Sequence, residues 1–175
     1  MKHRIHTLIA ALALLLFAVA ASTASATEAV AKPGFPSGTW IGAGYGEAQI
    51  ALDGDLITLY STNLSFTLNV SKDRKVTGKG TLRSLQTGSG SVGSRITGVA
   101  KLTFSGTPTN VRYAGTQVVT TKFVDAAHVQ GRTFTRRISG GLAINKARSC
   151  RVSGGHRFEG VTFTWKAALK GVTCR

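Results

Sequence analysis

The sequence predicts an all-β protein, a single antiparallel up-and-down barrel or closed sandwich of about eight to nine strands. Two observations predict this class: apolar and polar residues alternate along most of the chain, and turn-forming residues separate the alternating runs. Helical periodicity is nearly absent after Ser37. Because successive side chains of a strand point to opposite faces, the alternation indicates antiparallel strands that each present one face to a core.

The alternation is clearest in residues 66–71, 96–104 and 161–170, where β-branched and aromatic residues, which favour strands, dominate. In chain order, strands are expected near residues 38–44, 47–52, 56–60, 64–71, 76–85, 95–105, 110–123, 129–139, 141–152 and 158–170, with some of these merging. The residues expected to face the core are Phe66, Leu68, Val70, Leu102, Phe104, Ile138, Val161, Phe163 and Trp165. A register slip of one residue would expose all of them.

Turn chemistry separates the expected strands. The predicted turns are Asp53-Gly54, Lys72-Asp73-Arg74, Gly106-Thr107-Pro108, Asp125-Ala126-Ala127 and Gly154-Gly155. The glycine- and serine-rich stretch from Ser84 to Ser94 predicts a flexible connection, either a lid over one mouth of a barrel or a plain hairpin tip. Its G-x-G-x-x-G pattern, residues 88–93, precedes an expected strand instead of a helix, which excludes a dinucleotide site.

The beginning of the chain predicts export. Lys2 and Arg4 precede an apolar run, and Ala24-Ser25-Ala26 provides a small-residue cleavage site, so residues 1–26 are expected to be a secretory signal peptide. Residues 27–36 are then an exposed N-terminal lead-in, and residues 37–175 form a single β domain. The expected location is secreted or periplasmic.

The charge of the chain is strongly positive. It carries 22 Lys and Arg against seven Asp and Glu, a formal net charge of +15. Between residues 129 and 175 the ten basic residues accompany a single acid, Glu159. A surface this cationic attracts anionic partners through its long-range field, although charge that serves solubility alone would give the same composition.

The two cysteines, Cys150 and Cys174, predict a structural disulfide because their number is even and the expected compartment is oxidising. Their separation is too long for a redox-active C-x-x-C pair. They also have no zinc-like spacing to His128 or His156, so no metal is expected.

Candidate catalytic groups are sparse. Ser153 lies near His156, and Glu47 with Asp55 could form a carboxylate pair, but neither set has the surrounding motif that catalysis requires. Asp53-Gly54-Asp55 lacks the further ligands of a calcium loop. The sequence therefore predicts a protein that is not an enzyme and has no cofactor.

Gly38-Thr39-Trp40 resembles the G-x-W signature that opens the first strand of the calycin barrels, the lipocalins and avidins. The resemblance implies that Trp40 closes one end of an up-and-down barrel and that a basic residue of the last strand, Lys166 or Lys170, packs across it. The residues after Trp40 lack the Asn and Ser that bind biotin in avidins, so biotin is not the implied ligand.

The favoured function is a secreted, non-catalytic cationic protein that binds an anionic surface, glycan, lipid or acidic protein, with space for a small ligand in the barrel interior. The anion-seeking basic face is assigned to Arg132, Arg136, Arg137, Arg148, Arg151 and Arg157. On a strand, Arg132 and Arg136 share one face, whereas Arg137 lies on the other.

The sequence gives less support to three other partners or functions. Nucleic acid is disfavoured because Phe134 and Phe158 are the only aromatics interleaved with these arginines, and single-stranded bases need aromatic stacking. An enzyme inhibitor with an acidic target remains an alternative. A small outer-membrane β-barrel is the other, although the chain has few aromatics for interfacial girdles.

Overall fold

A computed structural model describes residues 34–52, 56–88, 93–124 and 129–173. It confirms the all-β class and decides for a barrel: eight antiparallel strands follow one another in chain order, and the last pairs with the first. The strands are β1 (Gly38–Leu52), β2 (Leu56–Val70), β3 (Val76–Gly88), β4 (Gly93–Thr107), β5 (Asn110–Val124), β6 (Val129–Ala147), β7 (Arg151–Phe158) and β8 (Val161–Leu169). No helix capable of crossing a membrane occurs in the described part of the chain.

Most strand positions agree with the alternation, and the differences lie in their merging and at the C-terminal end. The expected pairs 38–44 with 47–52, and 56–60 with 64–71, merge into β1 and β2. The predicted Gly154-Gly155 turn is wrong, because both residues lie inside β7. The strand predicted at 141–152 is divided, since β6 ends at Ala147 and a turn precedes β7.

Close packing, not turn geometry, explains the glycine at position 154. A Cβ there would collide with the carbonyl oxygen of Ala143 and lie 2.8 Å from Cζ2 of Trp165. The turn between β7 and β8 instead lies at Glu159-Gly160, where φ is 48° and 84°. This left-handed backbone suits a two-residue hairpin connection, and glycine adopts it without a steric cost.

The core fills the barrel interior, as the alternation predicts. Seven of the nine residues expected there are buried: Phe66, Leu68, Val70, Leu102, Phe104, Phe163 and Trp165. The other two, Ile138 and Val161, are partly buried and pack against the same cluster. The ring of Phe66 lies 5.6 Å from those of Phe104 and Trp165, in the tilted and edge-on arrangements that aromatic pairs prefer.

The segment before β1 closes the end of the barrel at which β1 begins. Phe35 donates its backbone N–H to the Pro108 carbonyl at 2.9 Å, and its ring stacks 5.7 Å from that of Trp165. The Trp40 indole donates to the Pro36 carbonyl at 2.8 Å. The prediction of an exposed lead-in is therefore wrong for Phe35, which is buried, although Pro36 is exposed.

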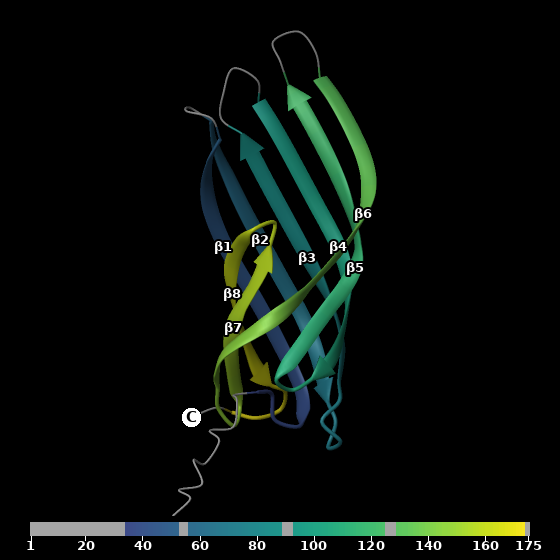
Figure 1. Cartoon of the computed structure of the whole chain (residues 1–175), viewed down its shortest axis with the longest axis vertical. Helices are drawn as coiled ribbons and strands as arrows, with labels where there is room; N and C mark the ends of the chain where they lie inside the picture. The colour runs from purple at the N-terminus through teal and green to yellow at the C-terminus, as the bar shows by residue number, and fades with distance from the viewer. Residues whose placement is uncertain (1–33, 53–55, 89–92, 125–128, 174–175) are drawn as a thin grey trace, which may run out of the picture. The chain divides into compact units, whose positions relative to one another are not determined.

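The barrel wall is complete along only part of its length. β7 and β8 are much shorter than the other strands, so β8 pairs with β1 only from Trp40 to Tyr45, and β7 pairs with β6 only from Leu142 onward. Within the described residues, 46–52 of β1 and 129–141 of β6 therefore pair on one side only. Figure 1 shows these two strands continuing past the tip of the β7–β8 hairpin.

The predicted flexible connection between residues 84 and 94 is shorter than expected. Residues 84–88 of β3 pair with residues 94–98 of β4, so the ladder continues into the glycine- and serine-rich stretch. Residues 89–92 lie outside the described residues, as do the predicted turns at 53–54 and 125–127. The predicted turn at Lys72-Asp73-Arg74 is confirmed, whereas the one predicted at Gly106-Thr107-Pro108 begins only at Pro108, because Gly106 and Thr107 belong to β4.

Candidate functional site

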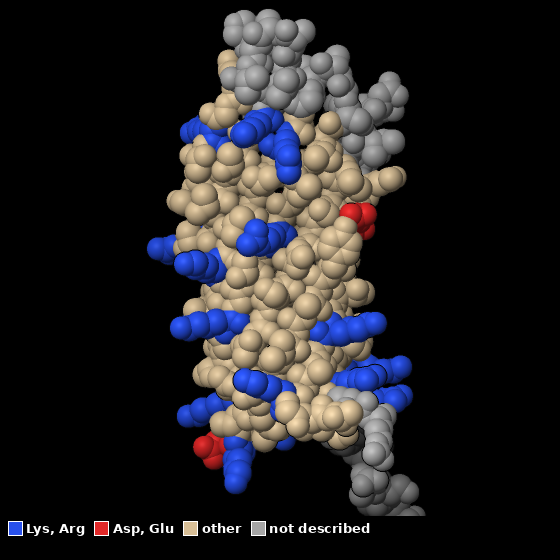
Figure 2. All heavy atoms as spheres, turned by 180° about the vertical axis from the view of Figure 1, so that it is seen from behind, with Lys and Arg blue, Asp and Glu red and all other residues tan. Residues whose placement is uncertain are grey.

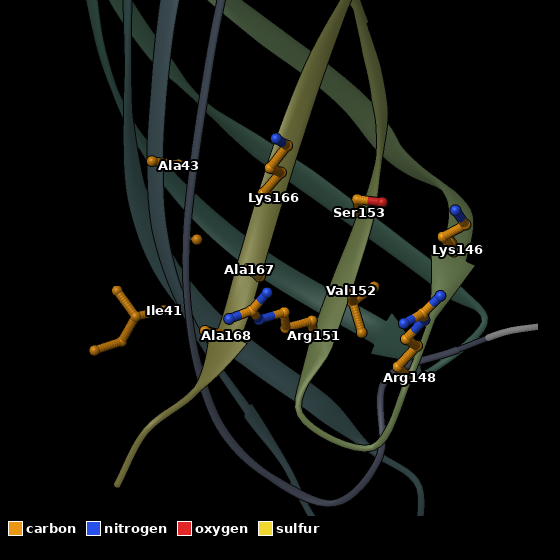
Figure 3. Close-up of a pocket in the computed structure, with 11 residues that line it drawn as sticks. Ile41, Ala43, Lys146, Arg148, Arg151, Val152, Ser153, Lys166, Ala167 and Ala168 are labelled. Atoms are coloured by element: carbon orange, nitrogen blue, oxygen red, sulfur yellow. The ribbon is translucent and has the colours of Figure 1, made fainter. Parts of the chain in front are cut away.

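A groove on the outer surface of the barrel carries a cluster of cationic side chains, and we refer to it as the basic groove. It has a volume of about 590 Å³ and lies over β7 and β8 and the adjoining parts of β6 and β1 (Figure 3). Its four cations are Lys146, Arg148, Arg151 and Lys166. The remaining lining residues, mostly small or apolar, are Ile41, Gly42, Ala43, Val152, Ser153, Ala167 and Ala168.

Strand register places these side chains in rows. Lys146 pairs with Ser153, Ser153 with Lys166, and Lys166 with Ala43. Neighbouring strands lie about 4.8 Å apart, so the backbones of the two lysines are about 10 Å apart with a hydroxyl group between them. Figure 3 shows Ser153 between Lys146 and Lys166 in this way.

A second row of paired residues forms the apolar floor of the basic groove. Arg151 pairs with Ala168, and Ala168 pairs with Ile41, whose side chain is exposed. Arg148 also lines the basic groove, from the turn before β7, where its backbone N–H donates to the Arg151 carbonyl at 2.8 Å. Short alanine side chains between long cationic ones leave the surface hollow, and this makes the groove.

The basic groove combines concavity with a uniform sign of charge. None of its lining residues is acidic, and the acidic residues in the described ranges are Glu47, Asp73 and Glu159. On the face shown in Figure 2, lysines and arginines are spread over the surface and are not gathered in one patch. A hollow of about 610 Å³ elsewhere on the barrel is lined by two cations, Lys79 and Lys101, so the basic groove is distinguished by its four cations and not by concavity alone.

The structure does not bring the six predicted arginines together. Arg148 and Arg151 line the basic groove, but Arg137 lies exposed on the outer face of β6 and Arg157, exposed on β7, donates its Nε to the Gly160 carbonyl at 3.2 Å. Arg132 and Arg136 occupy alternate positions of β6, on the face opposite that of Arg137.

Arg136 lies on the inner face of β6 and belongs to a polar network there, although its side chain is 41% exposed. Its Nε donates to Oε1 of Gln117 at 2.7 Å, and Gln117 donates to the Ser84 hydroxyl at 3.1 Å. Its Nη2 forms an ion pair with Glu159. The Tyr60 hydroxyl donates to the other Glu159 oxygen at 2.6 Å, and burial raises the pKa of this phenol.

Sequence reasoning missed Lys146 as a groove residue and assigned Lys166 a different role. The undivided strand predicted at 141–152 concealed the pairing of Lys146 with Ser153. Lys166 and Lys170 are exposed, so the expectation that one of them packs across Trp40 is wrong. The ring of Phe35 takes that place, edge-on to Trp40 at 5.4 Å. Trp40 itself is fully buried at the start of β1, as the G-x-W pattern implies.

Cys150 lies half-buried in the turn between β6 and β7. Its carbonyl accepts a hydrogen bond of 3.0 Å from the backbone of Leu169, so this turn lies against the end of β8. Cys174 lies outside the described residues, and the disulfide between the two cysteines stays a prediction.

The Ser153 and His156 side chains point to opposite faces of β7, so they do not form a nucleophile and base pair. His156 is buried beside Phe163 with neither ring nitrogen hydrogen-bonded, and burial lowers its pKa to about 4. Glu47 accepts a hydrogen bond from the Tyr45 hydroxyl, and Asp55 lies outside the described residues. In the described ranges, no group of three or more His, Cys, Asp or Glu side chains is placed to hold a metal ion.

Comparison with known proteins gives no relative: no family model, no curated protein and no solved structure matches the chain.

Proposed function

We propose that the protein is a secreted, non-catalytic binding protein that engages an anionic partner through the basic groove. The observation that carries the proposal is a hollow lined by four cations and no acid, above a floor of small and apolar residues. Lysine ammonium groups are compact charges on flexible stems, and the Ser153 hydroxyl between two of them adds a hydrogen-bond donor and acceptor. The partner is an anionic surface, glycan, lipid or acidic protein.

The test compares retention of the purified protein on heparin, on anionic lipid vesicles, on an acidic protein and on a neutral support over a salt series. The double variant Lys146→Gln, Lys166→Gln removes two groove charges. The matched control Arg95→Gln, Lys122→Gln removes the same charge from a cross-strand pair of exposed residues on β4 and β5.

If the basic groove binds the partner, the groove variant elutes from one anionic support at clearly lower salt than the control variant. Equal weakening by the two variants would show that only net charge matters and would contradict the proposal. Retention that does not fall with salt would contradict any charge-driven binding, because ions screen exposed charges over about 10 Å at 0.1 M salt.

The distribution of side chains argues against the outer-membrane alternative. Exposed charged residues interrupt the outer face of the barrel in the middle of several strands, whereas a membrane barrel presents an uninterrupted apolar band to lipid. These residues are Lys79, Arg83, Lys101, Arg137 and Lys166. Most large apolar residues of the strands point inward instead, although Ile41, Tyr45, Val99 and Val118 are exposed.

Membership of the calycin group is likewise a proposal. The closed up-and-down barrel and the buried Trp40 at the start of β1 support it. The exposed Lys166 and Lys170 count against it, because the resemblance implies a basic residue across the tryptophan.

A further inference from the structure

A smaller cavity lies on the inner side of the barrel wall, and we call it the inner cup. Its volume is about 350 Å³, and it is lined by Tyr60, Ser84, Gln86, Ile96, Val119, Thr121, Phe134, Arg136 and Glu159. We propose that the inner cup binds a small organic carboxylate with a compact apolar body, and that Arg136 holds its carboxylate group. This site is separate from the basic groove, with which it shares no lining residue.

Arg136 is positioned in advance for such a ligand. The Gln117 side chain, 0% exposed, accepts from its Nε, and the guanidinium carbon lies 5.9 Å from the centre of the Phe158 ring. Arginine has five N–H donors. Within the described residues, Gln117 and Glu159 accept one hydrogen bond each, so the guanidinium retains further donors for a carboxylate. Holding the group in place beforehand lowers the entropic cost of binding.

The network itself shows that this position accepts a carboxylate. One carboxylate oxygen of Glu159 forms the ion pair with Arg136, and the other accepts a hydrogen bond from the Tyr60 hydroxyl. Glu159 comes from the two-residue turn of the β7–β8 hairpin, and its side chain is about one-third exposed. Its carboxylate therefore competes with a ligand for the same arginine.

The part of the inner cup next to Arg136 is apolar, because Phe134 precedes Arg136 by two residues on the same face of β6 and Val119 pairs with Phe134. Ile96, Val119 and Phe134 come from the inner faces of β4, β5 and β6, and the Phe134 ring is 42% exposed although it lies on that face. The edge of β6 beside it is unpaired, because residues 129–141 of β6 pair on one side only in the described chain. An apolar ligand body would cover the exposed Phe134 ring.

The volume of the inner cup limits the size of the ligand that it can hold. Pockets for small molecules usually measure about 300–1,000 Å³, so the inner cup is at the lower end of that range. A bicyclic aromatic acid is therefore a suitable probe, and we choose 2-naphthoate. Its uncharged counterpart, 2-naphthalenemethanol, has the same apolar body without the carboxylate.

Calorimetric titration of the purified protein tests the proposal. 2-Naphthoate should bind at least about tenfold more tightly than the alcohol, as expected when a charge-assisted hydrogen bond contributes. Arg136→Gln should lower the affinity by about tenfold or more, whereas Arg137→Gln, the next residue on the opposite face of β6, should leave it unchanged. Glu159→Gln should raise the affinity, because it neutralises the competing carboxylate.

Two further variants, Thr121→Trp and Glu159→Gln, test binding in the inner cup if Arg136→Gln fails to fold. Thr121→Trp should fill the inner cup and abolish binding while Arg136 stays in place. Binding that survives Thr121→Trp, equal affinity for acid and alcohol, or an affinity that Glu159→Gln fails to raise would each overturn it. Loss of 2-naphthoate binding in Lys146→Gln, Lys166→Gln would place the ligand in the basic groove and also overturn it. The two sites are thus tested independently.

Discussion

Acidification should destabilise the protein through His156. The imidazole is buried in the core with neither ring nitrogen hydrogen-bonded, and burial lowers its pKa from 6.5 to about 4. The folded chain therefore keeps this ring neutral, whereas the unfolded chain binds a proton near pH 6.5. Because the unfolded state binds more protons in this range, the stability is complete above pH 6.5 and falls as the pH drops toward 4.

The two pKa values set the size of the effect. Linkage gives a loss of about 2 kcal/mol from the free energy of unfolding between pH 8 and pH 5. Denaturant unfolding at both pH values, followed by the fluorescence of the buried Trp40 and Trp165, measures it. The variant His156→Leu cannot bind the proton, so the difference between it and the native chain isolates this residue from other titrating groups.

The native chain should lose about 2 kcal/mol more than His156→Leu on this change of pH. An equal loss in both proteins would refute the reasoning, since it would mean that His156 is hydrogen-bonded or hydrated in the folded state. A native chain that becomes more stable at pH 5 relative to the variant would refute the sign as well.

Three further predictions concern stability. Phe35→Ala should lower the free energy of unfolding by about 3–5 kcal/mol, measured by denaturant titration, because it empties the closed end of the barrel; an effect below 1 kcal/mol would contradict that closure. Gly154→Ala should lower the free energy of unfolding by about 1–3 kcal/mol in the same assay. The control Gly131→Ala should lower it by less, because its new Cβ would lie 3.5 Å from the nearest atom. Similar losses in the two variants would contradict the packing argument. Intact-mass analysis after alkylation without reductant should find no free thiol at Cys150 or Cys174. Reduction should lower the free energy of unfolding by about 3–4 kcal/mol. Two alkylated cysteines would refute the disulfide.

The alternation was sufficient to predict the fold class and the inward side of most strands. Phe66, Leu68 and Trp165 are buried as expected because a strand has only two faces and one of them fills the interior. The same rule correctly placed Arg136 and Arg137 on opposite faces of β6. The boundaries between strands were harder to predict, because a glycine such as Gly154 can be required by close packing as well as by a turn.

The composition of the candidate site could not be predicted from one strand at a time. The basic groove depends on the register between four strands, which sets Lys146, Ser153 and Lys166 side by side. The bulge in the pairing between Ile144 and Lys146 shifts that register and leaves no clear sign in the alternation. The interior network was also hidden, because the pairing of Arg136 with Glu159 depends on where the β7–β8 hairpin ends.

The short β7–β8 hairpin has a consequence for the order in which the protein folds. β1 reaches its second neighbour only when β8 is present, so the barrel closes through contacts between the two ends of the domain. Forming such distant contacts is slow, because a long loop must be ordered before they contribute stability. Until then, β1 and β6 each leave one backbone edge unpaired, and the hairpin covers this edge only at residues 40–45 of β1 and 142–147 of β6. Another chain can pair with such an unpaired edge. During synthesis, late docking of the β7–β8 hairpin would therefore promote aggregation, and rapid docking would suppress it.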